Sequence, residues 1–357
     1  MRMKSGTWVC LLLLLGLGFL ISCSSKNSSS SGTGVLYVTT QGDALVTPFS
    51  VDLNTGSIAS LGTGVGTGTT PAAIILTPTE DAAFVANRDS NDISRYTVKS
   101  DNTLTAVAGN AVAGIAPVDM AIDSAGHFLF VANRGSDDIS VFSIGSGASL
   151  TEIANSPFPA APNPVALHAS GSFLYVANDV SAVVSAYSFD SSGTLTPVPG
   201  PSFTAGTTPS GVVVTPDGKF LYATNSGSNN VSAFTINSDG SLTPLSSSPV
   251  SAGLGPLSPH VDPSGQFLYV ADEQSFQVSG YKISSGTGTL TALSTPTIST
   301  GTHPVWLAIH PGGVYLYVAN NGGATISAYK INTTSGVLGV VGSPFTTGGQ
   351  PSAIGLK

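Results

Sequence analysis

The tetrapeptide FVAN at residues 84–87 returns along the chain at an almost constant interval. Related copies are FVAN at 130–133, YVAN at 175–178, YATN at 222–225, YVAD at 269–272 and YVAN at 317–320, and a degenerate first copy, YVTT, stands at 37–40. The aromatic residues that open successive copies lie 45–48 residues apart. A fixed period of this length is typical of a protein built from repeated structural units.

A second marker repeats independently with the same period. It is a proline followed by an apolar segment, and its copies begin at Pro71, Pro117, Pro164, Pro209, Pro256, Pro304 and Pro351. Two markers therefore give seven copies of one unit.

Each unit has the pattern of four strands. In the second unit the strands are predicted at residues 71–77, 82–87, 92–98 and 104–109. Turn sequences such as TPDG at 215–218 and DPSG at 262–265 separate the first two strands, with Pro, Asp and Gly where tight turns favour them. Four strands in each of seven units predict an all-β fold, a seven-bladed β-propeller that spans residues 35–357 as a single domain.

The order of the two markers predicts how the ring closes. The first YVTT copy has no proline-led strand before it, and the last proline-led strand, residues 351–357, has no strands after it. The C-terminal strand is therefore expected to complete the first blade as its innermost strand, which removes two open sheet edges.

Composition excludes several other classes of protein. The chain of 357 residues has 11 Lys and Arg, 19 Asp and Glu, and is 8% charged, with Glu only at Glu80, Glu152 and Glu273. A mainly helical fold is excluded, because helices rely on Glu, Lys and Arg. A hydrophobic content of 41% excludes disorder. The net charge of −8 excludes nucleic acid as a partner.

The N-terminal segment predicts export and a lipid anchor. Arg2 and Lys4 precede an apolar run at residues 8–21, which is short for a membrane span and typical of a signal peptide. The run ends in LISC at 20–23, which resembles a bacterial lipoprotein signal. The resemblance implies a signal peptide at 1–22, lipidation of Cys23 and a tether at 23–34; the alternative is a simple secretory signal with an incidental Cys23.

This segment also gives an expected location. The mature chain would retain one cysteine and form no internal disulfide. By the same resemblance, Ser24 after the cysteine implies the outer membrane of the cell envelope, with the periplasmic and surface faces both open. We expect a monomer attached to the membrane through its lipid.

The repeats resemble a known family. The aromatic–Val–Ala–Asn runs, with the Asn- and Asp-rich turns and Ile-Ser-x-Tyr/Phe strands that follow them, are similar to the YVTN repeat and to lactonase-type seven-bladed propellers, which include 6-phosphogluconolactonase-like proteins. The resemblance covers residues 34–357. It implies that His, Glu and Arg near the central channel carry out the reaction, but the inner strands here contain no Glu and no Arg.

The proline-led strands contain most of the candidate site residues. Alternation along a strand predicts that positions two, four and six after the proline face the channel. Position two includes Asp119 and Trp306, position four includes His168 and His260, and position six includes Asp123, Asp262 and His310.

These residues give a catalytic hypothesis and two alternatives. His260, Asp262 and His310 are the catalytic candidates, in which a His–Asp pair activates water against a lactone carbonyl. The candidates for ligand binding are His168, His303, Trp306, Asp119, Arg88 and Arg134. The same histidines with Asp262 have the chemistry of a metal site, although none is predicted. The structural alternative is a set of hydrogen-bonded channel groups.

Two functions from different classes follow. The first is an envelope-anchored binding module whose loops bind a protein, a glycan or a small molecule. The alternative is a lactone hydrolase that uses the channel His and Asp residues. A third, weaker hypothesis is a metal or redox-cofactor site in the channel. Such a site would have no Cys or Met ligands to support it, and no cofactor is expected.

Overall fold

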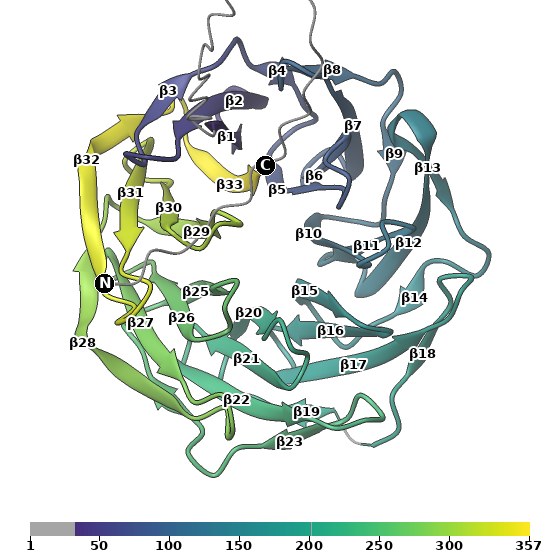
Figure 1. Cartoon of the computed structure of the whole chain (residues 1–357). Coiled ribbons are helices and arrows are strands. Elements are labelled where there is room, and N and C mark those ends of the chain that lie inside the picture. The colour runs from purple at the N-terminus through teal and green to yellow at the C-terminus, as the bar shows by residue number, and fades with distance from the viewer. Residues whose placement is uncertain (1–32, 201) are drawn as a thin grey trace, which may run out of the picture. The chain divides into compact units, whose positions relative to one another are not determined.

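The computed structural model describes residues 33–200 and 202–357. In this part of the chain the strands form seven separate sheets arranged as the blades of a ring (Figure 1). The seven-bladed β-propeller predicted from the repeats is confirmed. The predicted signal peptide, Cys23 and most of the tether lie outside the described residues. Thr33 and Gly34, assigned to the tether from sequence, begin the first strand.

The three inner strands of every blade follow the repeat. The innermost strands are β33 (Pro351–Leu356) in blade 1, then β5 (Pro71–Leu76), β10 (Pro117–Ile122), β15 (Pro164–Ser170), β20 (Pro209–Val214), β25 (Pro256–Val261) and β29 (Pro304–Ile309) in blades 2 to 7. The second strands are β1 (Thr33–Thr40), β6 (Ala82–Asn87), β11 (Phe128–Asn133), β16 (Phe173–Asn178), β21 (Phe220–Asn225), β26 (Phe267–Asp272) and β30 (Tyr315–Asn320). The third strands are β2 (Leu45–Asp52), β7 (Asp92–Val98), β12 (Asp138–Gly145), β17 (Val183–Phe189), β22 (Asn230–Ile236), β27 (Gln277–Ile283) and β31 (Thr325–Ile331).

The outer edge of the blades is less regular. The fourth strands are β3 (Ile58–Ser60), β8 (Leu104–Ala106), β13 (Ser149–Glu152), β18 (Leu195–Pro197), β23 (Leu242–Pro244), β28 (Leu290–Ser299) and β32 (Leu338–Thr346). In blades 1 to 5 a second short segment continues this edge: β4 (Val65–Gly66), β9 (Ala111–Val112), β14 (Phe158–Pro159), β19 (Phe203–Thr204) and β24 (Val250–Ser251). A single 3-10 turn, η1 (Ser146–Ala148), is the one helical element of the described residues, and no helix there has the length and apolar character needed to cross a membrane.

The second strand is the core of each blade. In β6, β21, β26 and β30 every residue is buried, because both faces of the strand contact neighbouring blades. This burial explains the low charge of the sequence, since a strand covered on both faces has no place for a solvated charge.

A buried hydrogen bond joins the second and third strands of six blades. The residue that ends the VAN-type run bonds the serine seven positions later: Asn87 to Ser94, Asn133 to Ser140, Asn178 to Ser185, Asn225 to Ser232 and Asn320 to Ser327 at 2.9–3.0 Å, with Ser279 donating to Asp272 at 2.6 Å. Each Asn or Asp in this set is fully buried. The Asn of the repeat therefore fixes the tight turn between two strands.

Tyrosine hydroxyls connect neighbouring blades. On the second strand, Tyr222 donates to the Gly288 carbonyl at 2.7 Å and Tyr269 donates to the Gly336 carbonyl at 2.6 Å, each in the next blade. On the third strand, Tyr281 donates to the Ser251 carbonyl of the preceding blade at 2.7 Å. In blades 4, 6 and 7 such bonds run to both neighbouring blades, so this part of the ring is linked by polar contacts as well as by packing.

The C-terminal strand closes the ring as predicted. In sheet order β33 is the innermost strand of blade 1 and pairs antiparallel with β1, with Val38 opposite Ile354 (Figure 1). Ser352 reinforces the closure, since its hydroxyl lies 2.8 Å from the Thr39 hydroxyl and donates to the Pro71 carbonyl of blade 2 at 2.6 Å.

Deletion of residues 351–357 should open the ring. It exposes the inner edge of β1 and removes the buried Ala353 and Ile354 side chains, so we expect the free energy of unfolding to fall by at least about 5 kcal/mol. Chemical denaturation monitored by circular dichroism measures this loss. Lys357→Ala, which keeps the strand, is the control, and a truncated protein with unchanged stability would contradict the closure.

Replacement of a buried repeat asparagine should also destabilise the fold. Asn133→Ala removes bonds to Asp138 at 2.7 Å and to Ser140 at 2.9 Å, and a buried serine loses its partner, so a loss of about 2–3 kcal/mol is expected. Asn110 lies on the exposed surface, and Asn110→Ala should change stability by less than about 0.5 kcal/mol. Equal unfolding midpoints for the two variants would argue against the role of the repeat asparagine.

Candidate functional site

The seven inner strands can be compared position by position, because they share one backbone pattern. Two residues after the proline, four blades have a small residue: Ala73, Ala166, Gly211 and Ala353. The other three blades depart from this, with Asp119, Ser258 and Trp306. The fold therefore does not need a polar or bulky side chain at this position.

Four residues after the proline the same contrast appears. Five blades have a small or apolar residue: Ile75, Ala121, Val213, Ala308 and Gly355. The exceptions are His168 and His260, in blades 4 and 6. Polar side chains on the channel wall are thus exceptions to the repeat.

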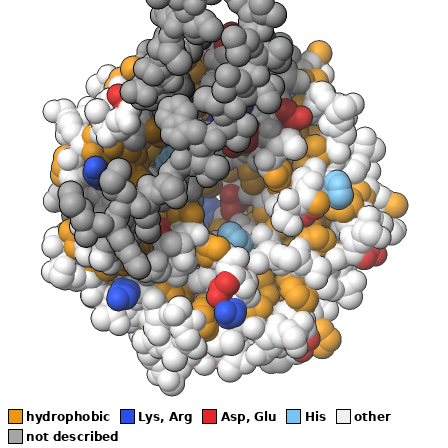
Figure 2. Space-filling model, viewed as in Figure 1, with side chains coloured by type: hydrophobic (Ala, Val, Ile, Leu, Met, Phe, Trp, Pro, Cys, Tyr) orange, Lys and Arg blue, Asp and Glu red, His pale blue; other side chains and the backbone are white. Residues whose placement is uncertain are grey.

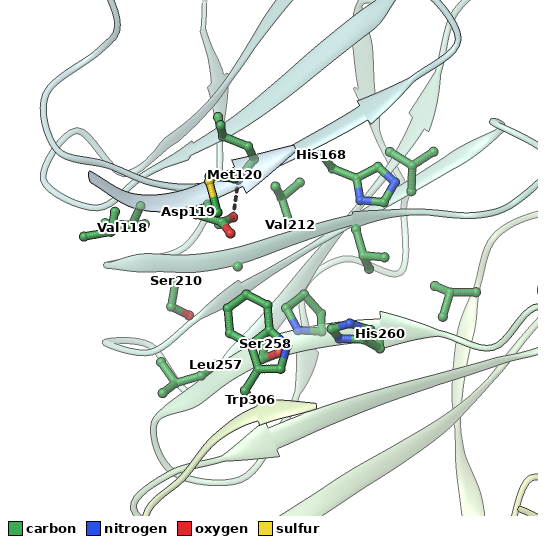
Figure 3. Close-up of a pocket in the computed structure, with 18 of the residues that line it drawn as sticks. Val118, Asp119, Met120, His168, Ser210, Val212, Leu257, Ser258, His260 and Trp306 are labelled. Atoms are coloured by element: carbon green, nitrogen blue, oxygen red, sulfur yellow. Dashed lines mark hydrogen bonds between the residues drawn. The ribbon is translucent and has the colours of Figure 1, made fainter. Parts of the chain in front are cut away.

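All of these exceptions line one cavity of about 490 Å³, which we call the central cavity. Asp119 and His168 lie on one side of it, and Ser258, His260 and Trp306 lie on the other (Figure 3). The remaining wall is mostly apolar and includes Val118, Met120, Val212 and Leu257. In the space-filling view, acidic and histidine side chains are visible within the hollow at the middle of the ring (Figure 2).

Asp119 has an environment unusual for a carboxylate. One carboxylate oxygen, Oδ2, accepts a hydrogen bond from the Leu167 backbone N–H at 2.8 Å. Burial raises the pKa of Asp119 to about 7, and the backbone N–H groups of Leu167 and Met120 oppose this rise. In blade 6 the neutral Ser258 hydroxyl accepts the equivalent bond from the Leu307 N–H at 3.1 Å. A carboxyl group is therefore not required for the structural contact, which points to a chemical role for Asp119.

The two channel histidines are held in the neutral form. Burial lowers the pKa of His168 to about 4. Burial also lowers the pKa of His260 to about 4, and the nearby His168 adds to the effect. The Nδ1 atom of His260 is shielded from solvent and has no hydrogen-bond partner among the described residues. At neutral pH these imidazoles are uncharged and able to accept a proton.

The structure places the position-six residues outside the central cavity. In blades 3, 6 and 7 the inner strand ends at position five, so Asp123, Asp262 and His310 belong to the turn. The Asp262 carboxylate accepts bonds from the Gln266 and Phe267 N–H groups at 2.8 and 2.7 Å, and the Asp123 carboxylate caps the equivalent turn. The structure therefore does not pair Asp262 with His260.

His310 has the same local role. Its Nδ1 atom accepts a bond from the Gly312 N–H at 3.0 Å. It stands at the turn that follows β29 and is not among the residues that line the central cavity. Of the three catalytic candidates from sequence, the cavity contains only His260.

The candidate arginines differ in position. Arg88 is exposed and forms an ion pair with Asp89 at 2.8 Å. Arg134 pairs with Asp179 at 3.0 Å and lines a smaller cavity of about 260 Å³. That cavity shares Val118, Val165, Ser210 and Leu257 with the central cavity. Only Arg134 therefore lies next to the site.

His303 lies on the rim of the ring. Its Nδ1 atom is 3.4 Å from the Glu273 carboxylate, and its ring meets Phe276 edge-on with centroids 5.1 Å apart. It is exposed and does not line the central cavity.

Sequence reasoning missed Ser210 and Ser258, which line the cavity. The Ser210 hydroxyl donates to the Pro256 carbonyl at 2.6 Å. Their departure from the small or apolar residues of other blades was the available signal. No group of three or more His, Cys, Asp or Glu within residues 33–200 and 202–357 is placed to hold a metal ion.

The fold and the cavity together define a seven-bladed β-propeller with a cavity in its channel. The family model described as lactonase, 7-bladed beta-propeller, matches residues 30–166 and 148–299. The chain therefore belongs to the lactonase family of seven-bladed β-propellers. No curated protein matches the sequence.

Solved structures agree with this fold. A Bacteroides fragilis protein with the provisional name 6-phosphogluconolactonase has a TM-score of 0.81 and 21% identity, covering 92% of this chain and 99% of its own. The periplasmic gluconolactonase PpgL of Pseudomonas aeruginosa has a TM-score of 0.76 and 21% identity, covering 91% and 99%. Hydrazine synthase of Kuenenia stuttgartiensis, with a TM-score of 0.62 and 19% identity, covering 88% and 99%, shares the fold. The fold alone therefore does not fix a reaction.

The raised pKa of Asp119 predicts a pH-dependent effect on stability. Between its ordinary pKa of 3.8 and the folded value of about 7, the folded state holds a proton that the unfolded state has released. The contribution of Asp119 to stability therefore falls as the pH rises through this window. Asp119→Asn should be up to about 4 kcal/mol more stable than the wild type at pH 8 and nearly equal to it at pH 4. Urea denaturation at both pH values measures the difference, and equal midpoints at pH 8 would contradict the raised pKa.

Proposed function

We propose that this protein is a lactone hydrolase whose active site is the central cavity. The observation that carries the proposal is the convergence of Asp119, His168 and His260 on one cavity, at positions where the other blades have small or apolar residues. Membership of the lactonase family favours this function over the binding module that the sequence first suggested.

Neutral histidine supplies the general base. Hydrolysis begins when water attacks the lactone carbonyl carbon, and a base must take a proton from that water. His260 has a pKa of about 4 and is uncharged at pH 7. It therefore accepts the proton, while the Nε–H or Nδ–H of His168 is a hydrogen-bond donor for the negative charge that develops on the carbonyl oxygen.

Asp119 supplies the general acid. The tetrahedral intermediate collapses by breaking the ring C–O bond, and the departing oxygen needs a proton. With a pKa of about 7, Asp119 retains its proton over much of the neutral range. It donates that proton to the leaving oxygen, and the product is a hydroxy acid. His260 then passes its proton to Asp119, directly or through solvent, and both groups return to their starting protonation states.

The position of the polar exceptions argues against a recognition module. A protein or glycan would contact the loops at the faces of the ring, where Arg88 and His303 are exposed. The unusual residues instead lie inside the channel, where they are accessible only to a small molecule.

Hydrolysis of a panel of γ- and δ-lactones tests the proposal. We expect His260→Ala to lower kcat by about 10²–10⁴-fold and Asp119→Asn by about 10²-fold, because each removes a proton-transfer group. His127 is exposed in a turn on the surface, and His127→Ala is the control that should retain full activity. The proposal fails if no lactone is hydrolysed, or if the cavity variants match the wild type.

The pH dependence of kcat/KM should follow the two pKa values. Activity should rise through about pH 4, as His260 loses its proton, and fall above about pH 7, as Asp119 does. In Asp119→Asn the alkaline limb should disappear. A profile with the alkaline limb intact in that variant would assign the limb to another group.

A further inference from the structure

The central cavity is poorly suited to a charged substrate. Its polar side chains are Asp119, His168, Ser210, Ser258 and His260, and its described lining includes no Lys or Arg. A phosphoryl group carries a charge of about −1.5 to −2 and is normally bound by cations or by several N–H donors. The nearest arginine, Arg134, is already engaged by Asp179 and Asn163. A phosphorylated lactone would bring its charge towards the Asp119 carboxyl without a counter-ion.

The cavity also offers few partners for sugar hydroxyls. Ser210 already donates its hydroxyl proton to the Pro256 carbonyl at 2.6 Å. Ser258 accepts the Leu307 N–H at 3.1 Å. Asp119, His168 and His260 are occupied by the reaction itself. A substrate with several hydroxyl groups would bury them without hydrogen bonds, which is costly.

A second cavity of about 360 Å³ adjoins the first. Met120, His260 and Trp306 line both cavities, so the two meet at these side chains. Most of its other walls are aliphatic, from Ile74, Ile75, Leu76, Ile309, Ile354 and Leu356, and the polar residues among these other walls are Thr77 and Glu80.

Gly355 packs closely against the aliphatic wall of the second cavity. It occupies the position at which blades 4 and 6 have histidine. A Cβ atom on residue 355 would lie 2.6 Å from the Leu76 Cδ1 atom and 3.5 Å from Ile74. Any other residue would therefore intrude on this aliphatic wall.

We propose that the substrate is an uncharged lactone with an aliphatic substituent. This inference rests on the proposed function. The lactone ring lies in the central cavity between Asp119 and His260, and the substituent passes Met120 and Trp306 into the second cavity. The substrate class thus differs from phosphorylated and polyhydroxylated sugar lactones.

Three kinds of δ-lactone with the same ring size test the proposal. They are alkyl-substituted lactones of increasing chain length, glucono-δ-lactone and its 6-phosphate. We expect kcat/KM to be highest for the alkyl lactones, at least about tenfold lower for the sugar lactone and lowest for the phosphate. Within the alkyl series kcat/KM should rise by up to roughly fourfold for each methylene buried.

Substitution of Ile75 tests the second cavity directly. Ile75→Asn places an amide on its wall and should abolish the gain in kcat/KM with chain length. Activity on an unsubstituted δ-lactone, measured for each variant, is the reference from which the gain with chain length is calculated. Ile75→Val is the matched control and should keep most of the chain-length dependence. Thermal unfolding of both variants verifies that they fold.

The outcomes separate this inference from the proposed function. If glucono-δ-lactone or its phosphate is the better substrate, the inferred substrate class is wrong, but the proposed hydrolase function is supported. If no lactone is hydrolysed, the proposed hydrolase function is wrong, and binding measurements then decide which class of lactone the cavity prefers. Trp306 is the only tryptophan in the described residues, so its fluorescence reports binding in the cavity. A fluorescence change with alkyl lactones at lower concentration than with sugar lactones supports the inference, and the reverse order overturns it.

Discussion

The hydrogen bond from the buried repeat asparagine to a serine seven residues later is the contact on which the ring depends. It occurs in the same form in five blades, and Asp272 with Ser279 replaces it in a sixth. It fixes the turn between the second and third strands at the place where both are fully covered by neighbouring blades. Because a buried amide without partners is costly, this bond selects one register in each of these six blades, which therefore resemble one another closely.

The uniformity of the blades gives meaning to the departures from it. A residue common to most blades is explained by packing, whereas Asp119, His168, His260 and Trp306 each depart from the residue type that most other blades have at the same position. These four residues come from four blades, yet they meet in one cavity. Buried titratable groups reduce stability. No structural contact requires the carboxyl group of Asp119, because Ser258 makes the equivalent hydrogen bond in blade 6. We therefore propose that the cavity is the functional part of an otherwise regular scaffold.

The fold could be predicted from the sequence because its determinants are periodic and local. The same holds for the channel-facing side chains at positions two and four, since alternation along a strand is reliable until the strand ends. Asp262 and His310 could not be placed in this way, because each lies one residue beyond the end of its strand. Their side chains accept hydrogen bonds from N–H groups of the turn. The bond from Asp119 to the Leu167 N–H joins residues in adjacent blades, and only the assembled ring reveals it.

The proposed function requires that the exceptions to the repeat form one binding site for a lactone ring. A crystal structure of the protein with a lactam, the nitrogen analogue that resists hydrolysis, tests this most directly. We expect the lactam ring in the central cavity, with its carbonyl group within hydrogen-bond distance of His168 or His260 and its ring nitrogen near Asp119. A lactam bound at the loops on either face of the ring, with the central cavity empty, would contradict it.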